Sequence, residues 1–132
     1  MKEVTRQLVR IFRPQDIDWM GYEIDSVYDL SYHHIQKKAN GGKLTLDNGA
    51  LLNKSTAHPY LHVIEITDPE MYLYINNLLK NVNTQGYAPT RQQLLAVRSI
   101  LQQFEREHCS ATNNRGKKLI KTQYVERRGK FL

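Results

Sequence analysis

Apolar residues recur at helical spacing in three segments after residue 54. The first segment covers residues 55–66. Pro59 places the helix start near Ala57, because proline is tolerated only in the first turn of a helix, where a missing N–H costs little. Ser55 and Thr56 are the candidate N-terminal caps. We therefore predict a helix from Ala57 to the end of this segment.

The two later segments have clearer start signals. Asp68 followed by Pro69 pairs a capping residue with proline at the first helical position, and the sequence TRQQ from Thr90 has the pattern of a capping box. One apolar stripe follows each start. The stripes are Met71, Ile75, Leu78 and Val82, and Leu94, Val97, Leu101 and Phe104. We predict two helices whose stripes face the core.

Upstream of the helices the pattern is that of strands. The sequence SVYDLSYHHI, residues 26–35, is rich in aromatic and β-branched residues and leads into the loop QKKANGG. The sequence KLTLDNGALLN, residues 43–53, places Leu44 and Leu46 on one face and has a turn signal at Asn48-Gly49. We predict that these two strands form a hairpin. Residues 1 to about 30 give no clear assignment.

The length of 132 residues is that of one domain of ordinary size. Strands followed by helices indicate an α+β fold. It would have a hairpin-and-helix core at residues 28–66, a helical support at residues 68–108 and a C-terminal arm. No window approaches the roughly 18 apolar residues of a membrane span, and the start does not resemble a secretory signal. We expect a cytoplasmic protein without a membrane partner. The single cysteine, Cys109, cannot form an internal disulfide.

Positive charge is concentrated in the arm, residues 115–132. Seven basic residues stand there against Glu126, so 7 − 1 = +6, while the rest of the chain has 12 basic and 12 acidic residues. The basic residues are Arg115, Lys117, Lys118, Lys121, Arg127, Arg128 and Lys130. This distribution is typical of an arm that binds nucleic acid. A solvated tail that only aids solubility is the alternative.

Four of the five histidines lie within residues 32–62. His58 and His62 are four apart on the predicted helix, so both imidazoles project from one face and form half of a metal site. His33 and His34 are successive residues of a predicted strand. Their side chains point to opposite faces and cannot both bind one ion without distortion, so they should have different roles.

These residues, taken in order, resemble the ββα-metal motif of the HNH endonucleases. The matched features are a strand ending in HH, the Gly41-Gly42 turn, the Asp47-Asn48 pair and an HxxxH helix. The second strand histidine, the asparagine and the two helical histidines are separated by 14, 10 and 4 residues, which agrees with the family. The all-histidine form resembles most closely the nuclease domains of the DNase colicins. The resemblance covers residues 32–65, about a quarter of the chain.

The resemblance implies a role for each matched residue. His33, His58 and His62 would bind one divalent metal ion, and His34 would be the general base that takes a proton from the attacking water. Asn48 would tie the loop between the strands and orient that base. The implied activity is hydrolysis of phosphodiester bonds in DNA, which leaves a 5′ phosphate. Lys37, Lys38 and Lys43 flank the glycine turn and are candidates to hold backbone phosphates.

Three neutral imidazoles suit zinc, nickel or manganese and leave coordination positions open, as in a catalytic site. Magnesium is a further candidate. His33 stands where many relatives have aspartate, which leaves the identity of the metal open. Many relatives are braced by two CxxC pairs on a structural zinc, and this sequence has none. The helices after residue 68 would have to supply that support.

Each assignment has a structural alternative. The three metal-ligand candidates could form a zinc staple without catalysis, His34 could be a packed histidine, and Asn48 could be only a turn residue. The lysines could be merely solvated. His108, at the predicted end of the last helix, is expected to be structural. For the whole protein the alternatives are a non-catalytic nucleic-acid-binding module that keeps the metal-stabilised fold, and a nuclease directed at RNA.

Overall fold

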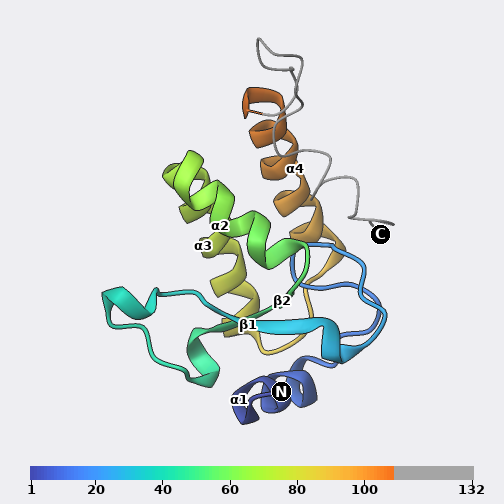
Figure 1. Cartoon of the computed structure of the whole chain (residues 1–132). Coiled ribbons are helices and arrows are strands. Elements are labelled where there is room, and N and C mark those ends of the chain that lie inside the picture. Colours follow the sequence, from blue (N-terminus) through green and yellow to red (C-terminus); the bar gives the residue numbers. More distant parts are fainter. Residues whose placement is uncertain (109–132) are drawn as a thin grey trace.

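The computed structural model describes residues 1–108 of the chain (Figure 1). Among these residues there are four α-helices, three short 3₁₀ helices and one two-stranded antiparallel hairpin, which confirms the predicted α+β class. The α-helices are α1 (Glu3–Phe12), α2 (Ala57–Thr67), α3 (Pro69–Gln85) and α4 (Arg91–His108), and the strands are β1 (Leu30–His34) and β2 (Gly49–Asn53). No helix of residues 1–108 is both long enough and apolar enough to cross a membrane.

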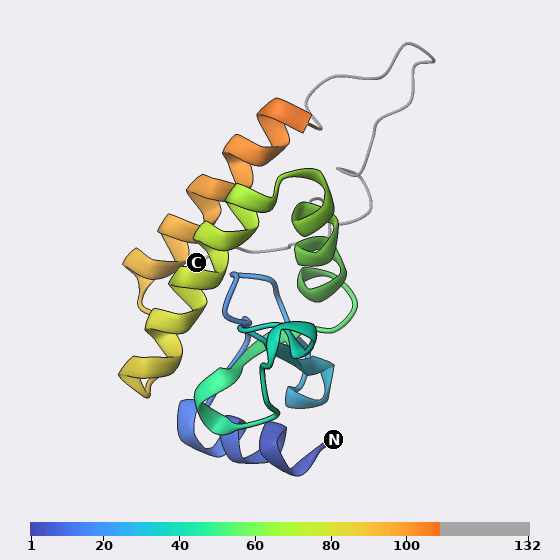
Figure 2. The same ribbon diagram turned by 90° about the vertical axis from the view of Figure 1, so that its left-hand side faces the viewer.

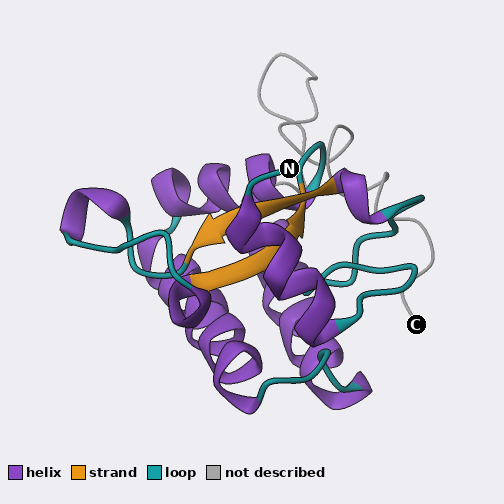
Figure 3. Ribbon diagram, turned by 90° about the horizontal axis from the view of Figure 1, so that it is seen from below, coloured by secondary structure: helices purple, strands orange, loops and turns teal. Residues whose placement is uncertain are grey.

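The hairpin lies between α1 on one side and the three later helices on the other (Figures 1 and 2). Its register pairs Leu30 with Asn53 and His34 with Gly49. Viewed from below, both short strands cross the helices near the middle of the molecule (Figure 3). Every residue of β2 is buried, whereas Ser31 and His34 of β1 are partly exposed.

The second strand is shorter than predicted. It begins at Gly49, and the preceding residues Leu46–Asn48 form a 3₁₀ turn. Leu44 and Leu46 are 44% and 40% exposed, so their alternation does not mark a buried face. The prediction of a strand over residues 43–48 is therefore wrong. This part of the loop is held instead by side-chain hydrogen bonds, which do not require strand geometry.

Helix α2 begins at Ala57, as predicted from Pro59, and Thr56, one of the two candidate caps, occupies the N-cap position. The Thr56 side chain, however, makes no capping hydrogen bond. The Asn53 Oδ1 atom accepts instead from the backbone N–H groups of Ser55 at 2.9 Å and Thr56 at 3.2 Å. The last residue of β2 therefore fixes the turn that leads into α2.

The predicted starts of the two later helices are confirmed. Asp68 Oδ1 accepts from the Met71 N–H at 3.2 Å, and Thr90 and Gln93 exchange the two hydrogen bonds of a capping box. The apolar stripes are buried as predicted, except that Leu78 is only partly buried.

The N-terminal region, which the sequence pattern left unassigned, folds around a buried carboxylate. Asp18 is 1% exposed. Its Oδ1 accepts from the N–H groups of Met20 at 2.9 Å and Tyr22 at 2.8 Å, and its Oδ2 accepts from the Asn53 N–H at 2.7 Å. Burial raises the pKa of Asp18 to about 7, although these hydrogen bonds act in the opposite direction. Asp18 thus connects the end of β2 with the loop of residues 18–22, which contains the buried Trp19.

We expect Asp18→Asn to destabilise the fold. The substitution replaces one oxygen by an NH₂ group that cannot accept, whereas each oxygen of a carboxyl keeps an acceptor lone pair even when protonated. At least one buried N–H then loses its partner, and the free energy of unfolding should fall by about 1–3 kcal/mol, measured by urea denaturation. Asp16→Asn removes an exposed carboxylate from the same loop and should change it by less than about 0.5 kcal/mol. Equal losses of stability in the two variants would contradict this role of Asp18.

Candidate metal centre

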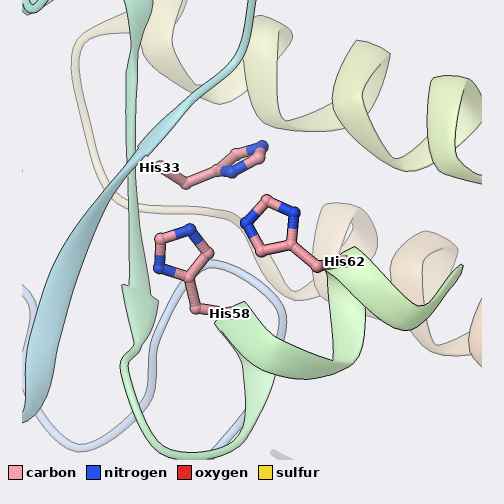
Figure 4. A group of neighbouring side chains, drawn as sticks. All are labelled: His33, His58 and His62. Carbon is pink, nitrogen blue, oxygen red and sulfur yellow. The ribbon is translucent and has the colours of Figure 1, made fainter. Parts of the chain in front are cut away.

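Three histidines from two elements converge between β1 and α2 (Figure 4). His33 comes from β1, and His58 and His62 come from successive turns of α2. One nitrogen of each imidazole lies within 4.8 Å of those of the other two. The ring centroids are 5.0–6.0 Å apart. The predicted set of metal ligands is therefore brought together in one place, and this group can hold a metal ion.

Each of the three rings has one nitrogen within hydrogen-bonding distance of a side-chain oxygen. His33 Nε2 lies 2.8 Å from Asn76 Oδ1, and His62 Nδ1 lies 3.2 Å from Glu65 Oε1. An amide oxygen and a carboxylate oxygen can only accept, so the imidazole nitrogens must be the N–H donors. The other nitrogen of each ring then carries a lone pair. In Figure 4 that nitrogen faces the space between the three rings.

The third ring is fixed through a serine hydroxyl. His58 Nδ1 lies 2.7 Å from Ser31 Oγ, and the same hydroxyl donates to the Leu52 carbonyl at 3.3 Å. With its one hydroxyl proton donated to Leu52, Ser31 Oγ can accept from His58 Nδ1–H. In that tautomer the Nε2 lone pair of His58 is available for a metal ion. Outer hydrogen bonds of this kind orient the histidines that bind metals in proteins.

Two of the rings are also held neutral by their surroundings. Burial lowers the pKa of His33 to about 4, an effect that its hydrogen bond to Asn76 opposes. Burial likewise lowers the pKa of His58 to about 4, and the nearby rings of His62 and His34 add to the effect. A histidine must be neutral to bind a metal ion, so these two candidate ligands need not lose a proton near pH 7.

His62 is the most exposed ligand of the three, with 52% of its side chain accessible. Its partner Glu65 also forms an ion pair with Lys37, whose Nζ lies 2.5 Å from Glu65 Oε2. This pair fastens the loop after β1 to α2. Lys37, a candidate phosphate contact, thus has a carboxylate partner within the protein.

His34 lies outside the three-histidine group but lines the same cavity. The cavity has a volume of about 260 Å³, and its walls include all four of these histidines together with Lys38 and Tyr72. The His34 ring packs edge-on against the Tyr32 ring, with 4.8 Å between the ring centroids. Burial lowers the pKa of His34, and the charges of Lys2 and Lys38 contribute in the same direction. A neutral imidazole that can accept a proton therefore borders the candidate metal site.

Asn48 ties the loop between the strands. Its Oδ1 accepts from the Gln36 N–H at 2.7 Å, and its Nδ2 donates to the carbonyls of Gln36 at 3.1 Å and Lys43 at 3.0 Å. Its own carbonyl accepts from the Ile35 N–H at 2.9 Å. These bonds fix the backbone directly after His34. The Lys43 side chain borders a separate polar cavity beside Asn48.

Helix α3 supports both the loop and the site. Besides the Asn76 contact with His33, the Lys80 ammonium donates to the Asp47 carbonyl at 2.5 Å. Asn83 Nδ2 donates to the carbonyls of Leu46 at 2.7 Å and Gly49 at 2.8 Å. Sequence reasoning expected support from the helices after residue 68 but identified none of these residues.

The remaining candidate residues lie elsewhere. His108 Nε2 is 3.3 Å from Asp68 Oδ2, so it joins the end of α4 to the start of α3. Together with Glu107 these two form the other cluster of potential metal ligands among residues 1–108. The arm residues Arg115, Lys117, Lys118, Lys121, Arg127 and Arg128 lie outside the described residues.

Comparisons of the chain with protein-family models, with curated protein sequences and with solved structures found no match.

We expect His62→Ala to weaken zinc binding. Loss of an outer hydrogen-bond partner alone costs about 10–100-fold in metal affinity, so loss of a ligand should cost at least about 100-fold. Wild-type protein should gain about 2.7 kcal/mol of stability when free zinc is 100 times its dissociation constant, and the variant should gain much less at the same concentration. Competition with a chromophoric chelator and thermal melting measure the two effects. His108→Ala is the control, and an equal loss of zinc affinity there would contradict the assignment.

We expect Asn76→Leu to lower zinc affinity by about 10–100-fold, because His33 loses the acceptor that fixes its ring. Asn76→Asp keeps an acceptor oxygen and should restore the affinity. Asn83→Leu is a matched control on the same helix, since it removes hydrogen bonds to Leu46 of the loop and Gly49 of β2 and none to a histidine. It should lower the unfolding temperature with little change in zinc affinity. If both leucine variants lose zinc affinity equally, Asn76 acts only through stability.

Proposed function

We propose that the protein is a metal-dependent endonuclease that hydrolyses phosphodiester bonds of DNA, with a ββα-metal core of the HNH type. The observation that carries the proposal is one shared cavity. It combines three imidazoles whose free nitrogens converge with a fourth, His34, that is outside the ligand group. A structural metal staple would require only the first three.

The order of elements supports the same proposal. A hairpin strand contributes His33 and His34, a loop tied by Asn48 follows, and α2 contributes the last two histidines. The loop between the strands covers residues 35–48 and is closed by side-chain hydrogen bonds on both flanks of the glycine turn. In this proposal the residues 30–67 form the core, and α3 takes the place of a bracing zinc.

A divalent ion held by His33, His58 and His62 would stabilise the charge that develops on the phosphate and on the leaving oxygen. His34 has the properties of a general base for the attacking water. It is partly exposed to the cavity, and its lowered pKa keeps it unprotonated at neutral pH. Asn48 would position it indirectly, by fixing the backbone at the two following residues.

Substrate would be held by cations around the cavity and by the basic arm. Lys38 borders the cavity beside His34. In the same proposal the arm contacts the DNA backbone through residues among Arg115, Lys117, Lys118, Lys121, Arg127 and Arg128. Lys37 contributes less to substrate binding in this proposal, because its ammonium is paired with Glu65.

The test is nicking of supercoiled plasmid by metal-loaded protein, with and without chelator. We expect His34→Ala to lower the nicking rate by at least about 100-fold, the usual contribution of a general base. Its zinc affinity should stay within about tenfold of wild type, because His34 is not a ligand. The His108→Ala variant removes a histidine far from the cavity and should nick at the wild-type rate.

Comparable nicking by His34→Ala would show that His34 is not the base. A wild type that binds zinc and DNA without cutting would identify a binding module instead. Cleavage of RNA but not of DNA under the same conditions would redirect the activity to RNA.

A further inference from the structure

Helix α1 presents a row of basic side chains on one face. Lys2 directly precedes the helix, and Arg6 and Arg10 follow at intervals of four residues. Residues four apart on a helix lie one above the other, so the three cations form a line. All three are exposed, whereas Leu8 and Phe12 on the opposite face are buried.

The row begins beside the candidate site. Lys2 borders a surface cavity together with Leu30, Ser31 and Tyr32 of β1, so it lies along the strand that ends at His34. Lys38, in the loop between the strands, lines the cavity that contains His34. Cations from two separate segments therefore lie next to the strand that carries His34.

We propose that Lys2, Arg6 and Arg10, here called the α1 row, bind the phosphate backbone of one DNA strand where it leaves the cleavage site. This inference rests on the proposed function. With a rise of about 1.5 Å per residue, successive members of the row are about 6 Å apart, which suits the spacing of neighbouring phosphates on one strand. Contacts of this kind set the position of a duplex and do not read its sequence.

The row has a defined end. Arg13, the next basic residue, borders a different cavity with Asp16, Trp19 and Pro89. The loop that follows is acidic, with exposed Asp16, Glu23 and Asp25. These carboxylates would repel a polyanion, so a strand that follows α1 should make no more than three contacts before it turns away.

One acidic residue interrupts the row. Glu3 lies 3.1 Å from Arg6 and 3.9 Å from Arg10, and Arg6 also donates to the Met1 carbonyl at 3.2 Å. Exposed ion pairs of this kind are weak, so phosphates can replace the carboxylate as the partner of the arginines. Removal of the Glu3 charge should therefore strengthen DNA binding, whereas removal of an arginine charge should weaken it.

The experiment measures affinity of the full chain for a short DNA duplex, with chelator present to prevent cleavage, as a function of salt. Each lost phosphate contact makes the slope of log affinity against log salt shallower by about 0.9. Arg10→Gln should show this change and bind roughly tenfold more weakly at 50 mM salt. Glu3→Gln should bind severalfold more tightly than wild type.

The matched controls remove the same charges from the far end of the molecule. Arg106 is in the last turn of α4 and Glu70 is in the first turn of α3. Both of these helix ends lie at the top of Figures 1 and 2, whereas α1 lies at the bottom. Arg106→Gln and Glu70→Gln should each leave the salt slope near the wild-type value. All variants keep the arm, so its contribution is common to them.

An unchanged slope in Arg10→Gln, or equal affinities of Glu3→Gln and Glu70→Gln, would overturn the α1 row, as would a wild type that does not bind duplex DNA. The proposed function is judged separately by nicking. A wild type that does not nick, but whose DNA affinity responds to α1 substitutions, contradicts cleavage alone. If the wild type nicks DNA but the α1 substitutions do not change DNA affinity, only the α1 row is contradicted.

Discussion

The hydrogen bond between His33 and Asn76 is the contact on which the geometry of the candidate site depends. It joins the hairpin to α3 in a region where His33 is 2% exposed and Asn76 is 6% exposed. A buried imidazole N–H without an acceptor costs about 1–3 kcal/mol, so the bond contributes to the fold. It also decides which His33 nitrogen keeps a lone pair. One contact therefore sets both the position of β1 against α3 and the readiness of His33 to bind a metal ion.

The helices after residue 55 could be predicted because their signals are local. A cap, a proline in the first turn and an apolar stripe all lie within a few residues of one another. The N-terminal region depends on distant partners instead, since the buried Asp18 bonds to Asn53, which is 35 residues away. The alternation of apolar and polar residues at Leu44 and Leu46 led to a wrong prediction of a strand. A surface loop held by hydrogen bonds can have the same order of apolar and polar residues as a half-buried strand.

The candidate ligands could be predicted because the kinds of residue and their order are distinctive, whereas the residues that orient them are ordinary. Ser31 stands two residues before His33 and Glu65 three residues after His62, so both share a face with a ligand, a signal that could have been read. Asn76 interrupts the apolar face of α3 between Ile75 and Leu79, which is a weaker hint of a buried polar contact. That Lys37 would pair with Glu65 depended on the path of the loop, which no local pattern gives.

The support given by α3 has a consequence for the order of events during folding. The hairpin and α2 are synthesised before α3. His33, however, bonds to Asn76, which lies 43 residues later in the chain. Leu46 in the loop bonds to Asn83, which lies 37 residues later. Contacts this far apart in sequence form slowly, because a long stretch of chain must be closed before they are made. Residues 30–67 would therefore leave the ribosome with a buried histidine still unpartnered. A nascent chain that stops before α3 is complete should hold an unformed site, and the segment from β1 to α2 should not fold when transplanted alone.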